Sequence, residues 1–177
     1  MVPDRKVLAA AYDRSAGTYD ARFRALQEVK YRAALPFLPA VAEGALCLDA
    51  GGGTGLFLEF LQERNHPLAR ARWLLFDLSL GMLREALPRS RLTVAADLSH
   101  PPLRPASVAL AVAFTSILDD VGRTLREMQL LLVPGGSLVA SFLAPEAKGG
   151  LAEAGSMRHM AGPVPAGQDQ LFVLRKA

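Results

Sequence analysis

A glycine-rich stretch, Asp49-Ala50-Gly51-Gly52-Gly53-Thr54-Gly55, separates two apolar segments of the 177-residue chain. Ala45–Leu48 before it is typical of a buried strand, and Leu56–Leu61 after it is typical of a short helix. A strand, a glycine turn and a helix N-terminus together bring backbone N–H groups within reach of a ligand. The sequence therefore predicts a ligand site at this turn.

The glycine spacing separates two classes of ligand. A dinucleotide fingerprint, G-x-G-x-x-G, that starts at Gly51 requires glycine at position 56, where the chain has Leu56. The pattern that fits is acid-x-G-x-G-x-G, led by Asp49. This stretch closely resembles the motif of the class I S-adenosylmethionine (SAM)-dependent methyltransferases, and it disfavours a nucleotide- or NAD-binding protein.

Strand and helix patterns alternate along most of the chain. Strands are expected at 46–49, 73–77, 92–96, 108–114 and 137–142, and helices at 56–64, 80–87 and from a cap at Asp119 or Asp120 to Leu132. Continuously apolar strands that alternate with helices indicate a parallel sheet covered on both faces. We therefore expect a single Rossmann-like, doubly wound α/β domain with a mostly parallel sheet.

The two ends of the chain depart from this alternation. Residues 1–44 are expected to form two helices, separated at Gly17, that cap the cofactor and acceptor site of a 45–177 core. Residues 143–170 are rich in glycine and proline, which predicts a short helix near 151–160 and an irregular or missing strand six. A sheet of six strands would then close with an antiparallel strand at 171–174.

Three acidic residues, Asp49, Asp77 and Asp97, follow predicted strands and should share one rim of the sheet. Asp77 is placed to accept both hydroxyls of the SAM ribose, and Asp97 to accept from the adenine amine. Asp49 is expected to orient the glycine loop or to meet the ligand amine through water. Alternatively, Asp77 is a helix N-terminal acid and Asp97 a turn residue.

Apolar and small residues are expected to complete the cofactor site. Leu78 and Met82 can supply faces for adenine, and Gly51 and Gly53 leave room for the amino-acid end of SAM.

Several further motifs resemble the ubiquinone/menaquinone-biosynthesis-like (type 11) subfamily of these methyltransferases. They are Tyr12-Asp13, Tyr19-Asp20, Asp77–Leu83, Asp97-Leu98 with Pro102-Leu103, Leu132–Gly136 and the closing Leu171–Lys176. The resemblance implies cofactor contacts from Tyr19, Gly51, Gly53, Asp77, Leu78, Asp97, Leu98 and Phe114. Tyr19 and Phe114 fit an ordinary helix core and an ordinary strand end equally well.

The expected function is transfer of the SAM methyl group to a small-molecule acceptor by direct in-line displacement. Such a reaction requires no covalent protein intermediate, so no catalytic residue is assigned. His100 or His159 could serve as a general base if the acceptor requires one. The alternative is a non-catalytic SAM-binding or regulatory module of the same fold.

Other features argue against nucleic-acid, metal and membrane functions. The net charge of +3 comes from dispersed basic residues, and Thr115-Ser116 does not match the N-P-P-aromatic motif of nucleic-acid methyltransferases. No His or Cys cluster has metal-ligand spacing, and Cys47 is the single cysteine. No run of 18 apolar residues is present, so we expect a cytoplasmic protein.

Overall fold

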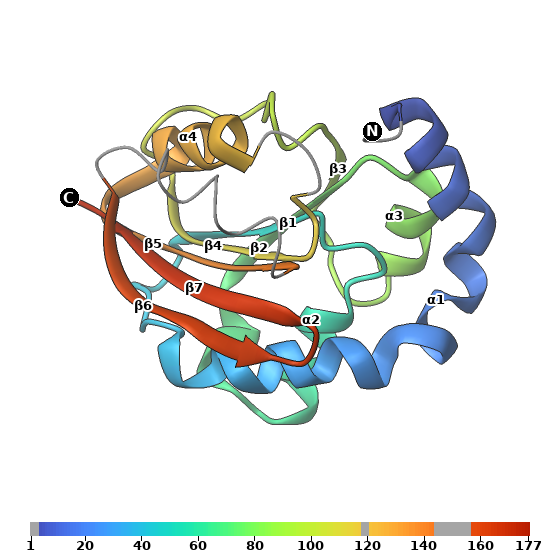
Figure 1. Ribbon diagram of the computed structural model, residues 1–177, viewed down its shortest axis with the longest axis horizontal. Helices are drawn as coiled ribbons and strands as arrows, with labels where there is room; N and C mark the ends of the chain where they lie inside the picture. The colour runs from blue at the N-terminus through green and yellow to red at the C-terminus, as the bar shows by residue number, and fades with distance from the viewer. Residues whose placement is uncertain (1–3, 118–120, 144–156) are drawn as a thin grey trace.

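The central element of the computed structural model is a seven-stranded sheet, built by the described residues 4–117, 121–143 and 157–177 (Figure 1). The strand order is β3-β2-β1-β4-β5-β7-β6. The strands are β1 (Leu46–Ala50), β2 (Arg72–Asp77), β3 (Thr93–Ala95), β4 (Val108–Phe114), β5 (Leu132–Leu143), β6 (Met157–Ala166) and β7 (Asp169–Lys176). Strands β1 to β5 pair in parallel, and β7 runs antiparallel to both β5 and β6.

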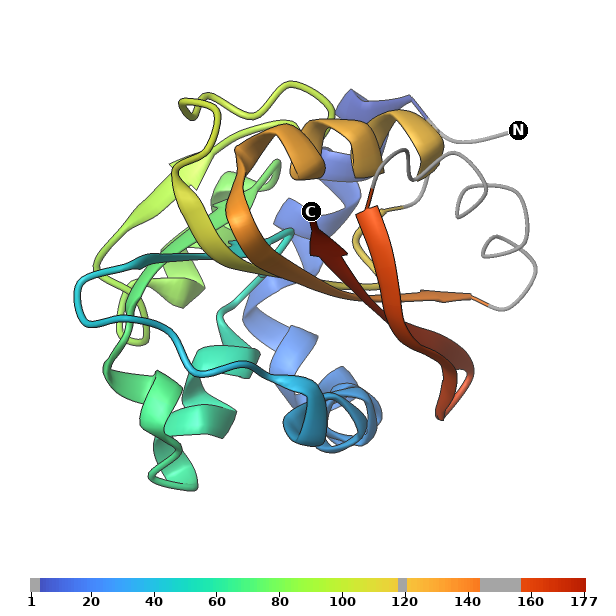
Figure 2. The same cartoon turned by 90° about the vertical axis from the view of Figure 1, so that its left-hand side faces the viewer.

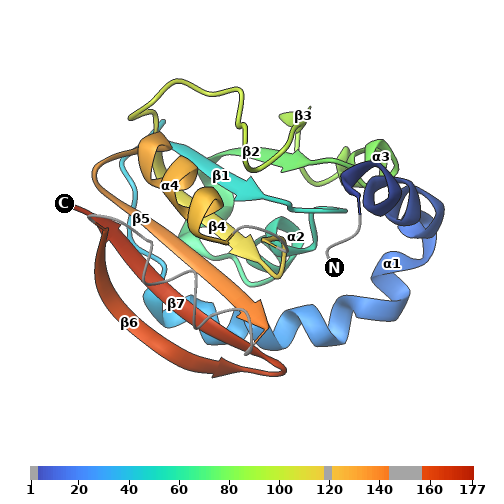
Figure 3. The same ribbon diagram turned by 45° about the horizontal axis from the view of Figure 1, so that its top comes forward.

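Helices cover both faces of this sheet, as the alternation of the sequence predicted. They are α1 (Arg5–Ala34), α2 (Leu56–Glu63), α3 (Leu80–Ala86) and α4 (Val121–Leu131), with 3-10 turns at Leu35–Phe37 and Pro67–Arg70. Figures 2 and 3 show α4 on one face and the second half of α1 with α2 on the other. The mostly parallel Rossmann-like architecture is therefore confirmed.

Successive strand residues point to opposite faces of the sheet, and this alternation divides the core in two. In β4, Ala111 packs with the cluster beneath α4, whereas Leu110 and Val112 pack with the cluster beneath α1, α2 and α3. Because both faces are buried, the strands carry apolar residues at nearly every position.

The core beneath α1 and α2 is dominated by aromatic rings. Tyr31 of α1 lies 5.2 Å from Phe57 and 5.0 Å from Phe114, measured between ring centroids, and Phe57 lies 5.6 Å from Trp73. Most of these pairs have the edge-on arrangement that aromatic quadrupoles favour. This cluster fixes the C-terminal half of α1 against the sheet.

The prediction that Gly17 separates two helices is wrong, because α1 is continuous over 30 residues. Gly17 has an open surface, with no atom of the described residues within 4 Å of the position that a Cβ would occupy. Glycine in a helix interior costs only about 1 kcal/mol relative to alanine, which the packing of a long helix can offset. Figure 1 shows that α1 nevertheless bends as it passes from one side of the sheet to its lower edge.

The expected six-stranded sheet is also wrong, because residues 157–166 form β6. The strand is irregular, as expected, with register shifts against β7 between His159 and Ala161 and between Ala161 and Val164. An edge strand tolerates the prolines Pro163 and Pro165, which cannot donate to a neighbouring strand. The short helix expected near 151–160 is excluded for residues 157–160, and its remainder lies outside the described residues.

Strand β5 starts earlier than the sequence indicates. It begins at Leu132, directly after α4, and contains the Pro134-Gly135-Gly136 segment that was expected to precede it. A register shift between Val108 and Leu110 of β4 accommodates this segment. The proposed helix caps Asp119 and Asp120 lie outside the described residues.

We predict that Phe57→Ala lowers the free energy of unfolding by about 3–5 kcal/mol, because it opens a cavity within the aromatic cluster. Leu80→Ala is the matched control, since Leu80 is 55% exposed, and it should change stability by no more than about 0.5 kcal/mol. Urea denaturation of the two variants measures the difference, and equal losses would contradict this description of the core.

Candidate functional site

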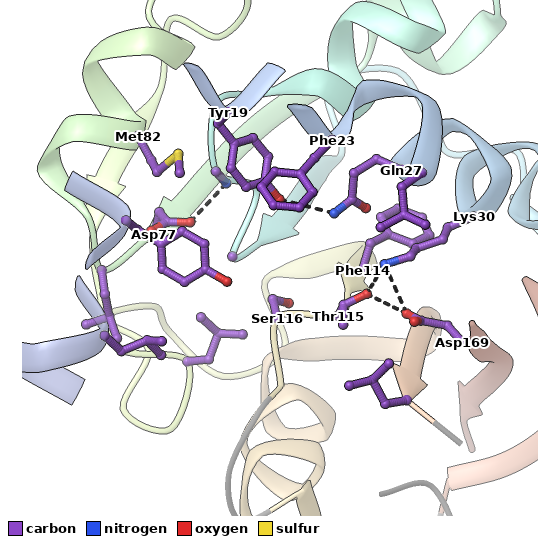
Figure 4. Close-up of a pocket in the computed structure, with 18 of the residues that line it drawn as sticks. Tyr19, Phe23, Gln27, Lys30, Asp77, Met82, Phe114, Thr115, Ser116 and Asp169 are labelled. Atoms are coloured by element: carbon purple, nitrogen blue, oxygen red, sulfur yellow. Dashed lines mark hydrogen bonds and ion pairs between the residues drawn. The ribbon is translucent and has the colours of Figure 1, made fainter. Parts of the chain in front are cut away.

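A cavity of about 370 Å³ lies at the carboxyl ends of β1, β2 and β4 (Figure 4). The glycine loop after β1, the end of β2 and the residues after β4 form its floor, and α1 forms its wall. Its main lining residues are Tyr12, Tyr19, Phe23, Gln27, Lys30, Gly51, Gly53, Asp77, Leu78, Met82, Leu98, Phe114, Thr115, Ser116 and Asp169. The cavity therefore occupies the edge at which open α/β sheets bind ligands.

The glycine loop packs too closely for side chains at Gly51 and Gly52. A Cβ on Gly51 would lie 2.3 Å from the Cβ of Ser116, and the φ of Gly51 is +71°. A Cβ on Gly52 would lie 2.6 Å from the Cγ of Asp49. The side chain of Ser116 also donates a hydrogen bond to the carbonyl of Ala50 at 2.6 Å. The loop is thus fixed against β1 and the segment after β4, with its backbone facing the cavity.

Asp77 presents a fixed carboxylate at the same edge. Its Oδ2 accepts from the backbone N–H of Gly53 at 2.9 Å, and its Oδ1 accepts from that of Ser79 at 2.8 Å. Burial raises the pKa of Asp77, and these hydrogen bonds oppose that rise because they stabilise the charged carboxylate. Each oxygen retains a lone pair, so the carboxylate can accept from the two hydroxyls of a ribose.

Asp49 lies beneath the glycine loop, outside the main cavity. It lines a smaller hollow with Tyr19, Gln27, Tyr31 and the loop glycines, and is 2% exposed. Its Oδ2 has no hydrogen-bond partner within the described part of the chain. Burial and, secondarily, the charge of Asp77 raise the pKa of Asp49 to about 7.

Asp97 also lies outside the residues that line the cavity, although its neighbour Leu98 is among them. Arg5 at the start of α1 donates a hydrogen bond to Asp97 Oδ2, and the backbone and hydroxyl of Ser99 both donate to Oδ1 at 2.8 Å. Its carboxylate is therefore engaged by the chain itself, and the expected contact with the adenine amine stays a prediction.

The cavity brings together most of the residues that the sequence singled out. Those that line it are Tyr19, Gly51, Gly53, Asp77, Leu78, Met82, Leu98 and Phe114. Tyr19 packs on Phe23 with ring centroids 4.8 Å apart, so this part of α1 is both helix core and cavity wall. The roles of these residues toward a cofactor remain predictions.

Acidic side chains attach α1 to the two neighbouring loops. The Oδ1 of Asp13 accepts from Ser79 Oγ at 2.6 Å and from the N–H of Gly81 at 2.7 Å. Asp20 Oδ1 accepts from Thr54 Oγ1 at 2.6 Å, at the end of the glycine loop. In each Tyr-Asp pair of α1, the tyrosine thus lies in the cavity wall and the aspartate carboxylate accepts hydrogen bonds from a neighbouring segment.

Sequence reasoning missed three buried polar residues in the cavity wall, Gln27, Lys30 and Asp169. Lys30 and Asp169 are each 3% exposed, and Gln27 is 8% exposed. The position of Lys30 on the same helical face as Phe23 and Leu26 was a usable signal, because a lysine is seldom buried without a partner. Asp169 begins β7, which gave no comparable signal.

Comparison with known families agrees with this geometry. Residues 48–140 match the family described as methyltransferase domain. The chain belongs to that family. The resemblance to class I, type 11 methyltransferases is thereby confirmed, and SAM is the methyl donor that membership implies.

Curated relatives are similar to this chain in sequence over most of its length. The malonyl-[acyl-carrier protein] O-methyltransferase of Yersinia pestis is 31% identical over 145 residues, which cover 80% of this chain and 52% of the relative. The protein of the same name from Serratia marcescens is 32% identical over 147 residues, covering 80% and 54%. The chain therefore spans about half the length of these relatives.

Solved structures show the same fold. A SAM-dependent methyltransferase from Thermotoga maritima, described as a possible histamine N-methyltransferase, superposes with a TM-score of 0.73 at 17% identity. The match covers 94% of this chain and 98% of that protein.

The described residues contain neither a metal-binding cluster nor a membrane-spanning helix. No group of three or more His, Cys, Asp or Glu side chains is placed to hold a metal ion. None of the helices in that part of the chain has the length and apolar character needed to cross a membrane.

We predict opposite effects for two glycine substitutions. Gly51→Ala should destabilise the fold by at least about 2 kcal/mol, from its positive φ and the clash with Ser116. Gly17→Ala should stabilise it by about 0.5–1 kcal/mol, since a Cβ there meets no atom within 4 Å in the described part of the chain. Thermal unfolding of both variants tests this, and a stabilising Gly51→Ala would contradict the described loop.

We also predict that Asp49 makes stability depend on pH. Its pKa rises from an ordinary 3.8 to about 7 in the fold, so its contribution is present below about pH 4 and lost as the pH rises through 7. Relative to Asp49→Asn, the wild type should lose about 2–3 kcal/mol of unfolding free energy between pH 5 and pH 8. Parallel pH profiles for the two proteins would contradict the raised pKa.

Proposed function

We propose that this chain transfers the methyl group of SAM to an oxygen of a small carboxylic acid carried as a thioester. The observation that carries the cofactor half of the proposal is the Asp77 carboxylate, held beside the open backbone of Gly53. Among the described residues, a Cβ on Gly53 would meet only Met82 Sδ, at 4.0 Å, which leaves space for a ligand at this point. Asp77 would accept from the ribose hydroxyls, with Leu78 and Met82 against the adenine.

The proposed reaction is a single displacement. An acceptor oxygen forms a bond to the methyl carbon while the bond from that carbon to the sulfonium sulfur breaks. The electron pair of the broken bond stays on sulfur, so the products are a methylated acceptor and neutral S-adenosylhomocysteine (SAH). The protein would contribute by aligning the three atoms and excluding water between α1 and the strand ends.

The acceptor class is inferred from the curated relatives. Both relatives described above are named for O-methylation of malonyl-[acyl-carrier protein]. A malonyl thioester has one free carboxylate, which is already a nucleophile at neutral pH and requires no general base. This chemistry agrees with a cavity in which neither His100 nor His159 is a lining residue.

The proposal is tested by incubating the protein with tritiated SAM and malonyl-pantetheine, malonyl-[acyl-carrier protein] or their carboxamide analogues. Label should enter the two malonyl thioesters as a methyl ester and should not enter the carboxamides. SAM binding without transfer to any acceptor would contradict the proposal and favour the alternative, a non-catalytic SAM-binding module.

We predict that Asp77→Asn weakens SAH binding by about 10–100-fold, because a charged hydrogen-bond acceptor contributes about 1.5–3 kcal/mol. Glu85→Gln on α3 makes the same carboxylate-to-amide change at an exposed position and should bind SAH like the wild type. Isothermal titration calorimetry gives both affinities. Unchanged SAH binding by a folded Asp77→Asn variant would remove Asp77 from the proposed cofactor site.

A further inference from the structure

A buried ammonium–carboxylate pair lies at the end of the cavity opposite Asp77. Figure 4 shows Asp77 and Met82 on one side and Lys30, Thr115 and Asp169 on the other. The Nζ of Lys30 lies 3.3 Å from Asp169 Oδ2, and the two side chains are 4% and 1% exposed. Two ions are rarely taken out of water together unless further hydrogen bonds compensate for the lost hydration.

One oxygen of the carboxylate in this pair, Asp169 Oδ2, has a full set of hydrogen-bond donors. Asp169 Oδ2 accepts from the hydroxyl of Thr115 and from Ser141 Oγ at 2.8 Å, in addition to the ammonium. Thr115 Oγ1 in turn accepts from Lys30. Asp169 Oδ2 therefore has no capacity for another donor.

The ammonium is less well satisfied. It carries three N–H donors, and Thr115 and Asp169 are its two partners among the described residues. One turn earlier on α1, Gln27 donates to the Tyr19 hydroxyl at 3.1 Å, but its Oε1 is buried without a partner in that part of the chain. An unused N–H in a buried wall is costly, and a ligand that accepts from Lys30 would remove that cost. Gln27 Oε1 instead requires a donor, which an ionised carboxylate does not supply.

The backbone of Thr115, which holds Lys30 and Asp169 together, is strained. Thr115 has a φ of +54°, in the left-handed region that β-branched residues rarely adopt. Its N–H is held by the carbonyl of Ser141 at 3.1 Å, which aims the hydroxyl between Lys30 and Asp169. Strain of this kind persists where the surrounding structure enforces it, and it concentrates at ligand sites.

From this geometry we infer that Lys30, held by Thr115 and Asp169, binds the carboxylate of the methyl acceptor. The inference rests on the proposed function and adds the residue that selects the acceptor. One carboxylate oxygen would accept the free N–H of Lys30, a charge-assisted hydrogen bond that a neutral amide or ester cannot match. The other oxygen would stay free to form the bond to the methyl carbon, and no proton is transferred because the carboxylate is already ionised.

The inference predicts a selective loss of acceptor binding. Isothermal titration calorimetry of the SAH-loaded protein would use malonyl-pantetheine and its carboxamide analogue as probes. Lys30→Met should weaken the binding of malonyl-pantetheine by at least about tenfold. The affinities for SAH and for the carboxamide should stay within about twofold of the wild-type values. Lys30→Arg should restore part of the malonyl affinity, and Arg32→Met, at an exposed position of the same helix, should behave like the wild type.

A second variant allows for loss of folding, since Lys30→Met leaves Asp169 buried without its cation. The double variant Lys30→Met/Asp169→Asn removes both charges. It should keep the wild-type affinity for SAH and lose affinity for malonyl-pantetheine to the same extent as Lys30→Met. Unchanged malonyl-pantetheine affinity in either folded variant would overturn the inference, as would a wild type that binds no malonyl-pantetheine.

The two proposals fail in different ways. If the wild type binds malonyl-pantetheine through Lys30 but never methylates it, the carboxylate subsite stands and the proposed reaction fails. If the wild type methylates malonyl-pantetheine and Lys30→Met leaves its KM unchanged, the reaction stands and the subsite fails.

Discussion

The junction between Asp20 of α1 and the glycine loop holds the cavity together. Asp20 accepts from Thr54 Oγ1 at 2.6 Å and pairs with Arg89 at 2.7 Å, and Arg89 also donates to the carbonyl of Thr54 at 2.9 Å. Together with the hydrogen bonds from Ser79 and Gly81 at the start of α3 to Asp13, this contact fixes the 30-residue helix α1 across the strand ends. These contacts fix the N-terminal half of α1, whereas the aromatic cluster around Tyr31 fixes the half that carries Gln27 and Lys30.

This placement gives the cavity two chemically different ends. Tyr12, Tyr19 and Phe23 form an aromatic wall in the first part of α1, whereas Gln27 and Lys30 add polar groups farther along the helix. The glycine loop and Asp77 would hold an adenosyl group, and the Lys30–Asp169 pair would hold the acceptor. In-line displacement needs such an arrangement, since the acceptor must approach the methyl group from the side opposite the sulfur.

Local sequence patterns predicted the features that depend on local interactions. Strand β4 ends where predicted, and Ser79 caps α3 by accepting from the N–H of Met82. The misassigned features depend on tertiary contacts. Helix α1 passes through Gly17 because the packing on either side outweighs a small propensity cost, and β6 forms because β7 supplies a partner despite its prolines.

The site residues also divide into those set by local sequence and those set by tertiary contacts. Asp77 and the loop glycines could be predicted because a motif fixes their spacing, whereas Lys30 and Asp169 are separated by most of the chain and meet only in the fold. A crystal structure with SAH and malonate tests this two-ended site most directly. We expect the ribose on Asp77, the sulfur facing the open cavity, and a malonate carboxylate on Lys30. Malonate bound elsewhere, or a sulfur turned away from Lys30, would contradict it.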